Sequence, residues 1–225
     1  MFRNLLLAIT LVPVLSFAQV KGKCQRANPF LHLEVFDGII VTLERGDEFE
    51  LCEGTDTKLE DLNITLTDSI LRIRKKAGVD YKGDPKIRII YIDLQSIKGF
   101  GKADIDTRNL VRVDSLNVSL KSGALLFANL DIDYLEADVS EGCVLTAKGY
   151  ADEQNLTANI KGTISAFELE GKNAKVKATS GGIIKINITE NLEANASTGG
   201  YINYKGSPIL DEKTSLGGKV VKDSE

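Results

Sequence analysis

Apolar and polar residues alternate along most of the chain with a period of two residues. In the first half, the alternation is clear in four runs, at residues 31–35, 39–44, 71–74 and 87–92. A period of two places every second side chain on the same face of an extended strand, so each run predicts a β-strand. Glycine-containing turns such as Asp37-Gly38 separate the runs. Only residues 57–63 favour a short helical turn, and the sequence therefore predicts an all-β fold.

The second half contains a degenerate repeat of alternating apolar or small residues. The triplets are Leu116-x-Val118-x-Leu120, Leu135-x-Ala137-x-Val139, Leu156-x-Ala158-x-Ile160, Val176-x-Ala178-x-Ser180 and Leu192-x-Ala194-x-Ala196, and they start 16 to 21 residues apart. A unit this short cannot bury its own apolar face, so successive units must stack on one another. The repeat predicts a parallel β-helix, in which the middle residues of the triplets form an inward ladder.

A glycine follows each triplet, and an apolar residue stands two positions after it. The glycines are Gly123, Gly142, Gly162, Gly182 and Gly200, and the apolar residues are Leu125, Val144, Ile164, Ile184 and Ile202. Glycine adopts positive φ at little cost, so these residues and the earlier Gly101 are predicted to form the corners of the coil. Ile184 is expected to face inward, stacked between Ile164 and Ile202. A β-sandwich would show the same alternation, but not a fixed apolar residue after every glycine.

Several segments resemble the head GIN domain family of putative auto-transporter adhesins. They are Phe36-Asp37-Gly38-Ile39-Ile40-Val41, Ser69-Ile70-Leu71-Arg72-Ile73, Ile97-Lys98-Gly99-Phe100-Gly101-Lys102-Ala103 and Gly199-Gly200-Tyr201-Ile202-Asn203-Tyr204-Lys205-Gly206-Ser207-Pro208. The resemblance implies an exported bacterial protein with a right-handed parallel β-helix, here with a more irregular N-terminal β portion. The family has no catalytic residues to transfer, and its usual Ser-Gly-Ser-Gly corners are eroded in this chain.

The expected organisation is a signal peptide at residues 1–18, an N-terminal arm at 19–29, the β-helix domain at 30–210 and a polar C-terminal tail at 211–225. Arg3, the apolar residues 5–15 and the small residues Ser16 and Ala18 are typical of a cleaved secretory signal. The apolar run is too short to span a bilayer. We therefore expect export to the periplasm, the cell surface or the medium, with Gln19 as the mature start and no transmembrane segment. The cationic residues before Cys24 argue against lipidation.

An exported chain with three cysteines leaves one of them unpaired. Cys24 precedes the first strand-like run and Cys52 ends the second, so a disulfide between them is one interpretation, with Cys143 free. The alternative is that all three are small buried apolar residues.

Composition and charge exclude several classes of function. The chain has 28 Lys and Arg residues against 32 Asp and Glu, a formal charge of −4, and no long basic run. Nucleic-acid binding is therefore not expected, and anionic membranes are disfavoured. A single histidine leaves little room for a His-based triad or a multi-His metal site.

The candidate chemical motifs are sparse, and no cofactor, metal or catalytic residue is assigned. Asp104 with Asp106, and Asp131 with Asp133, each place two carboxylates on one strand face, as a calcium site or a lyase would require. Their varying distances from the glycines predict that the carboxylates scatter around the coil. Solvation is expected for His32 and a structural corner for Gly99-Phe100-Gly101. The tyrosines Tyr134, Tyr150 and Tyr201 could stack on sugars, whereas Tyr204 is predicted to face inward.

Three functions fit this architecture. The first is a binding or adhesion module for an envelope or extracellular polysaccharide or a surface protein. The second is a polysaccharide-active enzyme, which would need acidic and basic side chains from successive coils to converge in one groove. The third is a structural envelope protein without a ligand. The sequence does not define the oligomeric state.

Overall fold

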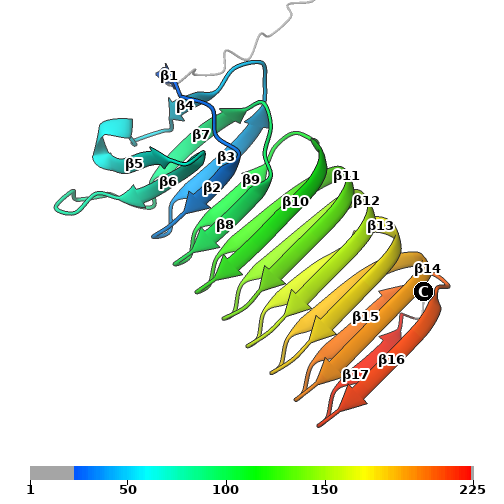
Figure 1. The fold of residues 1–225 in the computed structure, drawn as a ribbon. Coiled ribbons are helices and arrows are strands. Elements are labelled where there is room, and N and C mark those ends of the chain that lie inside the picture. Colours follow the sequence, from blue (N-terminus) through cyan, green and yellow to red (C-terminus); the bar gives the residue numbers. More distant parts are fainter. Residues whose placement is uncertain (1–22, 224–225) are drawn as a thin grey trace, which may run out of the picture.

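The computed structural model describes residues 23–223 as one continuous stack of β-strands (Figure 1). The elements are β1 (Cys24–Arg26), β2 (His32–Val35), β3 (Ile40–Arg45), β4 (Glu50–Glu53), the 3-10 helix η1 (Leu59–Asp61), β5 (Leu62–Thr67), β6 (Ile70–Lys75), β7 (Lys86–Tyr91), β8 (Ser96–Phe100), β9 (Asp104–Thr107), β10 (Val111–Lys121), β11 (Leu125–Val139), β12 (Val144–Ala158), β13 (Thr163–Ala178), β14 (Ile183–Ser197), β15 (Tyr201–Lys205), β16 (Ile209–Ser215) and β17 (Lys219–Lys222). This arrangement confirms the predicted all-β solenoid. Among residues 23–223, no helix is long and apolar enough to cross a membrane. The predicted signal peptide lies outside the described residues.

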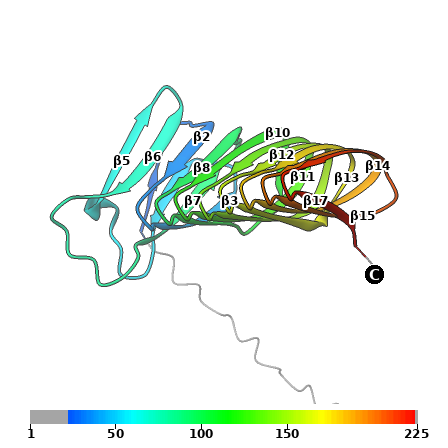
Figure 2. The ribbon, with the colours of Figure 1, turned by 90° about the horizontal axis from the view of Figure 1, so that it is seen from below.

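Each coil contributes one segment to each of two facing parallel sheets (Figure 2). The first sheet contains β7, β3, β9, the N-terminal parts of β11 to β14, β15 and β17. The second sheet contains β6, β2, β8, β10, the C-terminal parts of β11 to β14, and β16. The strands β11 to β14 are long because each runs through both sheets. Apolar side chains from the two sheets fill the narrow space between them.

Inward side chains stack in register from coil to coil. Ile184 lies between Ile164 and Ile202, and all three are fully buried, as predicted. The apolar residues at the same distance from Gly123 and Gly142 lie on the other side of the strand. Leu125 is 42% exposed and Val144 is half-buried, because both point outward. Their inward neighbours Leu126 and Leu145 continue the ladder instead.

The sequence alignment of the triplets is shifted by two residues in two coils. Val118 and Ala137 stack on Leu156 and Val176, not on the expected Ala158 and Ala178. Those two alanines belong to the next inward ladder, which also contains Leu120, Val139 and Ala196. A shift of two residues preserves the side of the strand on which each side chain lies, so alternation alone could not reveal it.

The predicted corner glycines occupy three different positions of one stacked turn. In each coil, two successive residues have positive φ; these pairs are Gly101-Lys102, Ser122-Gly123, Glu141-Gly142, Ile160-Lys161, Ser180-Gly181 and Thr198-Gly199. Positive φ therefore explains Gly101, Gly123 and Gly142, but not the other three predicted glycines. Gly162, Gly182 and Gly200 follow the pair, and a Cβ there would lie 2.0 to 2.2 Å from a carbonyl oxygen of the preceding coil. Their role is to permit close approach of two backbones.

The N-terminal end of the solenoid is irregular, as expected. β1 and β4 pair antiparallel, and a disulfide joins Cys24 to Cys52 between them. β5 and β6 form an antiparallel hairpin beside them. Cys143 is a free, buried cysteine in a distant coil, and burial raises the pKa of its thiol.

The solenoid continues beyond residue 210, the expected end of the domain. β16 and β17 add segments to the two sheets within the expected polar tail. Glu212 takes the inward register position of Ala194, and Lys222 takes that of Tyr204. The described part of the last coil thus places charged residues where earlier coils have apolar ones.

Candidate binding groove

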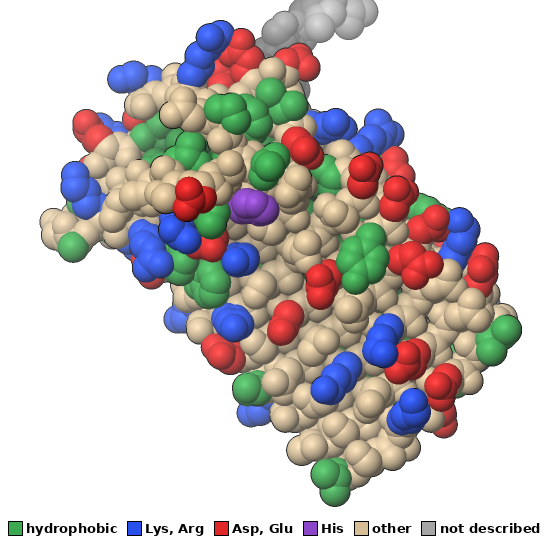
Figure 3. All heavy atoms as spheres, viewed as in Figure 1, with side chains coloured by type: hydrophobic (Ala, Val, Ile, Leu, Met, Phe, Trp, Pro, Cys, Tyr) green, Lys and Arg blue, Asp and Glu red, His purple; other side chains and the backbone are tan. Residues whose placement is uncertain are grey.

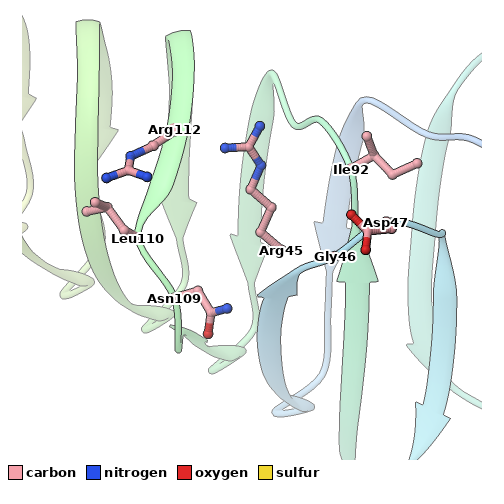
Figure 4. Close-up of a pocket in the computed structure, with 7 residues that line it drawn as sticks. All are labelled: Arg45, Gly46, Asp47, Ile92, Asn109, Leu110 and Arg112. Carbon is pink, nitrogen blue, oxygen red and sulfur yellow. The ribbon is translucent and has the colours of Figure 1, made fainter.

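A cavity of about 570 Å³ opens beside the ends of β3 and β7. Its lining residues are Arg45, Gly46, Asp47, Ile92, Asn109, Leu110 and Arg112 (Figure 4). The chain can turn out of β3 here because residue 46 is glycine: a Cβ would lie 2.5 Å from the Ile90 side chain. The other wall is the segment that connects β9 to β10.

Arg45 occupies the middle of this cavity. In Figure 4 its side chain stands between Leu110 and Arg112 on one side and Ile92 and Asp47 on the other. The Arg45 side chain forms no ion pair or hydrogen bond with the described residues. All five N–H donors of its guanidinium group are therefore available to a ligand. Ile92 is 41% exposed and provides apolar surface next to this charge.

A second cavity of about 330 Å³ shares Arg45 and Arg112 with the first and extends the groove across the next coils. Its further lining residues are Val113, Asp114, Asp131, Ile132, Asp133 and Tyr150. Arg112, Asp131 and Tyr150 stack in register on β10, β11 and β12. Arg112 Nε donates a 3.0 Å hydrogen bond to Asp131 Oδ2.

The two carboxylate pairs lie at different points around the coil, as expected: Asp131 and Asp133 line this groove, whereas Asp104 and Asp106 do not. Asp114 joins Asp131, Asp133 and two arginines there, so acidic and basic side chains of successive coils do meet in the groove. Strand register brings these outward residues into line.

Tyr150 ends the groove in a small network of polar side chains. Its hydroxyl donates a short hydrogen bond to Asp152, which also accepts one from Lys172. The bond to Asp152 raises the pKa of Tyr150, and the bond from Lys172 lowers the pKa of Asp152. Tyr150 is therefore protonated at neutral pH and fixed in orientation.

The other candidate residues lie outside the groove. Asp104 and Asp106 are on the outer face of the first sheet, and Tyr201 lies on the same face. Tyr134, 37% exposed, lies outside the groove on β11, and Tyr204 packs against the core as predicted. His32 is half-buried, with Nδ1 2.9 Å from Ser96 Oγ. The Phe100 ring of Gly99-Phe100-Gly101 stacks on Phe36 with a centroid distance of 4.7 Å.

Sequence reasoning missed Arg45, Asn109, Leu110 and Arg112. Arg45, Asn109 and Leu110 come from a strand end and a connection outside the repeat, so no spacing links them. Arg112 stands four residues before its triplet, as Asp131 does before the next one, and this shared spacing was the available signal for their pairing.

The fold and groove define an extended solenoid with an open polar cleft near its irregular end. The chain belongs to the family described as putative auto-transporter adhesin, head GIN domain, whose profile matches residues 29–208. This confirms the resemblance seen in the sequence.

Several solved structures have a similar fold. A putative adhesin from Parabacteroides distasonis is 24% identical, with a TM-score of 0.72, and the match covers 89% of this chain and 95% of that one. A putative adhesin from Bacteroides fragilis is 19% identical, with a TM-score of 0.77 and coverage of 89% and 94%. A putative lipid binding protein from Parabacteroides distasonis is 17% identical, with a TM-score of 0.65 and coverage of 91% and 98%. No curated protein matches the chain significantly.

Proposed function

We propose that the protein is an exported, non-catalytic binding module that holds a polysaccharide chain in the groove around Arg45 and Arg112. The observation that carries this proposal is the continuity of the groove from Asp47 to Tyr150 across several coils. An open groove that crosses several coils suits an extended polymer. The family of putative adhesins to which the chain belongs supports a binding role.

The chemistry of the lining supports a saccharide over an apolar ligand. Arg45 and Asn109 offer hydrogen-bond donors, while Asp114 and Asp133 offer acceptors. Sugar rings present hydroxyl groups around their edges and C–H groups on their faces, so they need both polar partners and apolar surface. Leu110 and Ile92 provide that surface. A surface protein is the alternative partner, and an extended polar segment of it would use the same contacts.

The experiment is a binding screen of the purified protein against a glycan array and insoluble envelope polysaccharides. Arg45→Gln and Asp133→Asn should each weaken binding about tenfold or more, because each removes a charged hydrogen-bonding group from the groove. Lys177→Gln, an exposed change on the second sheet, should leave binding unchanged. Equal binding by all variants would exclude the groove as the site.

A second candidate function comes from the same groove, since Asp131 and Asp133 lie beside basic side chains as a lyase or hydrolase would require. Asp131 Oδ2 already accepts a hydrogen bond from Arg112, so that oxygen is occupied. We therefore expect no new reducing ends or unsaturated products from polysaccharides that bind. Turnover that disappears in Asp131→Asn or Asp133→Asn, at unchanged stability, would establish the enzyme instead.

A further inference from the structure

The two parts of the groove differ in charge. The charged residues of the larger cavity are Arg45, Asp47 and Arg112, and the second cavity adds Asp114, Asp131 and Asp133. Both arginines line the larger cavity, but Asp47 is the only one of these acidic residues that does. A ligand that fills the whole groove must therefore suit a cationic part and an acidic part.

The acidic residues nearest to Arg45 in the first sheet leave its charge uncompensated. Glu44 precedes Arg45, but adjacent residues of a strand point to opposite sides. Both carboxylate oxygens of Glu44 are occupied: Oε2 accepts a 3.1 Å hydrogen bond from Arg88, and Oε1 lies 3.5 Å from Arg108 Nη1. Asp93 does not line the cavity, and its Oδ1 accepts a backbone hydrogen bond.

The larger cavity has an acidic side and a basic side. Asp47 stands with Ile92 on one side of Arg45, and Arg112 stands on the other (Figure 4). No ion pair joins Asp47 to Arg45 in the described part of the chain. Arg112 uses only Nε to bind Asp131, so its two terminal nitrogens have no partner among residues 23–223. The side toward Arg112 therefore favours an anionic group.

The second cavity disfavours a further anionic group. Asp114 and Asp133 are exposed, and neither forms an ion pair or hydrogen bond with the described residues. Ionised carboxylates accept hydrogen bonds and repel other anions. These two residues therefore suit the hydroxyl groups of uncharged sugars.

We propose that the groove selects a polysaccharide in which carboxylate groups are spaced among uncharged sugars, with one carboxylate bound by Arg45. This inference rests on the proposed function. The planar fork of a guanidinium group matches a carboxylate with two parallel hydrogen bonds. A neutral chain would leave the Arg45 charge without a partner. A chain with a carboxylate on every sugar would place negative charge against Asp114 and Asp133.

Graded methyl esterification of polygalacturonate and alginate tests the proposal. Both polymers carry a carboxylate on every sugar, and esterification removes these charges without changing the backbone. For at least one of the two polymers, partly esterified chains should bind the full mature protein at least about tenfold more tightly than fully esterified chains. They should also bind more tightly than unesterified chains.

Two variants should remove these two preferences separately. Arg45→Gln should bind partly and fully esterified chains within about threefold of each other, because the carboxylate has lost its cation. Asp114→Asn should reduce the preference for partly esterified over unesterified chains at least about threefold, because it removes a repulsive charge. Each readout is a ratio within one variant, so a change in the amount of folded protein does not alter it.

The matched control is Arg26→Gln, since Arg26 is an exposed arginine that pairs with Glu48 and does not line the groove. It should preserve both preferences. Equal binding of partly and fully esterified chains by the unmodified protein would overturn the inference, and so would tightest binding of unesterified chains. In either case Arg45-dependent binding of neutral glycans on the array would leave the proposed function intact. Failure of every polysaccharide to bind would overturn both.

Discussion

The backbone amide of Gly142 donates a hydrogen bond to the carbonyl oxygen of Ile160 on the next coil, with an N···O distance of 3.2 Å. The same bond recurs between neighbouring turns, from Gly123 to Glu141, from Lys161 to Ser180 and from Gly181 to Thr198. The turns of the solenoid are thus joined by a ladder of their own, in addition to the ladders of the two sheets. In each of these turns, two successive residues have positive φ.

Substitution of adjacent glycines should separate the two roles that glycine has in this turn. Gly182→Ala should lower the free energy of unfolding by more than about 3 kcal/mol, because its Cβ would lie 2.2 Å from the Ala158 oxygen. Gly181→Ala should cost only about 1–2 kcal/mol, since it has positive φ but its Cβ meets nothing closer than 3.7 Å. Denaturant titration of both variants measures the difference, and equal losses would contradict it.

The inward ladder predicts a large contrast between two neighbouring residues on β14. Ile184→Asp should destabilise the protein by about 3 kcal/mol or more, because it places an unpaired charge between Ile164 and Ile202. Lys185→Asp, which faces outward, should cost about 0.5 kcal/mol or less. Both values come from chemical denaturation at neutral pH, and similar losses would show that the register is wrong.

Glu34 should make the stability of the N-terminal coils sensitive to acid. Burial raises its pKa, but hydrogen bonds and charges from Arg72 and Lys98 outweigh that effect and leave the pKa below its usual value. A carboxyl group with a lowered folded pKa stabilises the protein above its unfolded pKa, and this contribution is lost as the pH falls through the folded value. The Glu34→Gln variant should therefore be less stable than the unmodified protein at pH 7. It should also lose less stability than the unmodified protein when the pH falls below about 4.5. Parallel stability curves for the two proteins would contradict the assignment.

The disulfide should stabilise the irregular end of the solenoid. It closes a loop with a sequence separation of 28 residues, for which loss of chain entropy in the unfolded state gives roughly 3–4 kcal/mol. Replacing Cys24 and Cys52 together by serine should lower the free energy of unfolding by about that amount. Reductant should then have no further effect on the double variant. Cys143→Ser is the control for the loss of a thiol, and it should not change the sensitivity of the protein to reductant.

Export predicts a mature chain that starts at Gln19. Intact-mass measurement on the envelope fraction of the native host should find the protein without residues 1–18. Retention of those residues, or an added lipid mass at Cys24, would contradict the proposal.

The fold was accessible from the sequence because alternation and repeat length are both direct consequences of stacked strands. The detailed register was not. Ala158 was assigned to the ladder of Ala137, whereas it belongs to the ladder of Val139. A shift of two residues leaves the alternation of apolar and polar residues unchanged, so the sequence could not show the difference. Leu125 and Ile164 stand at the same distance from Gly123 and Gly162 but on opposite sides of the strand, because Gly123 occupies an earlier position of the turn than Gly162.

The groove was less accessible than the fold. Asp131 and Asp133 were identified as a pair, and the repeat spacing links Asp131 to Arg112, but Arg45 comes from a segment that shares no repeat with them. A connection between β9 and β10 with no regular structure places Asn109 and Leu110 there. The position of these residues in the groove depends on where the chain folds back in three dimensions, and the periodicity of the sequence does not predict it.

The charged inward residues of the last described coil limit growth of the solenoid along its axis. Parallel strands with open edges are templates for fibres, because each new strand can pair with the one before it. A strand added to β16 would have to cover Glu212, and one added to β17 would have to cover Lys222, in the space where earlier coils bury alanine and tyrosine. A polymer built end to end would therefore bury an unfavourable charge at every joint.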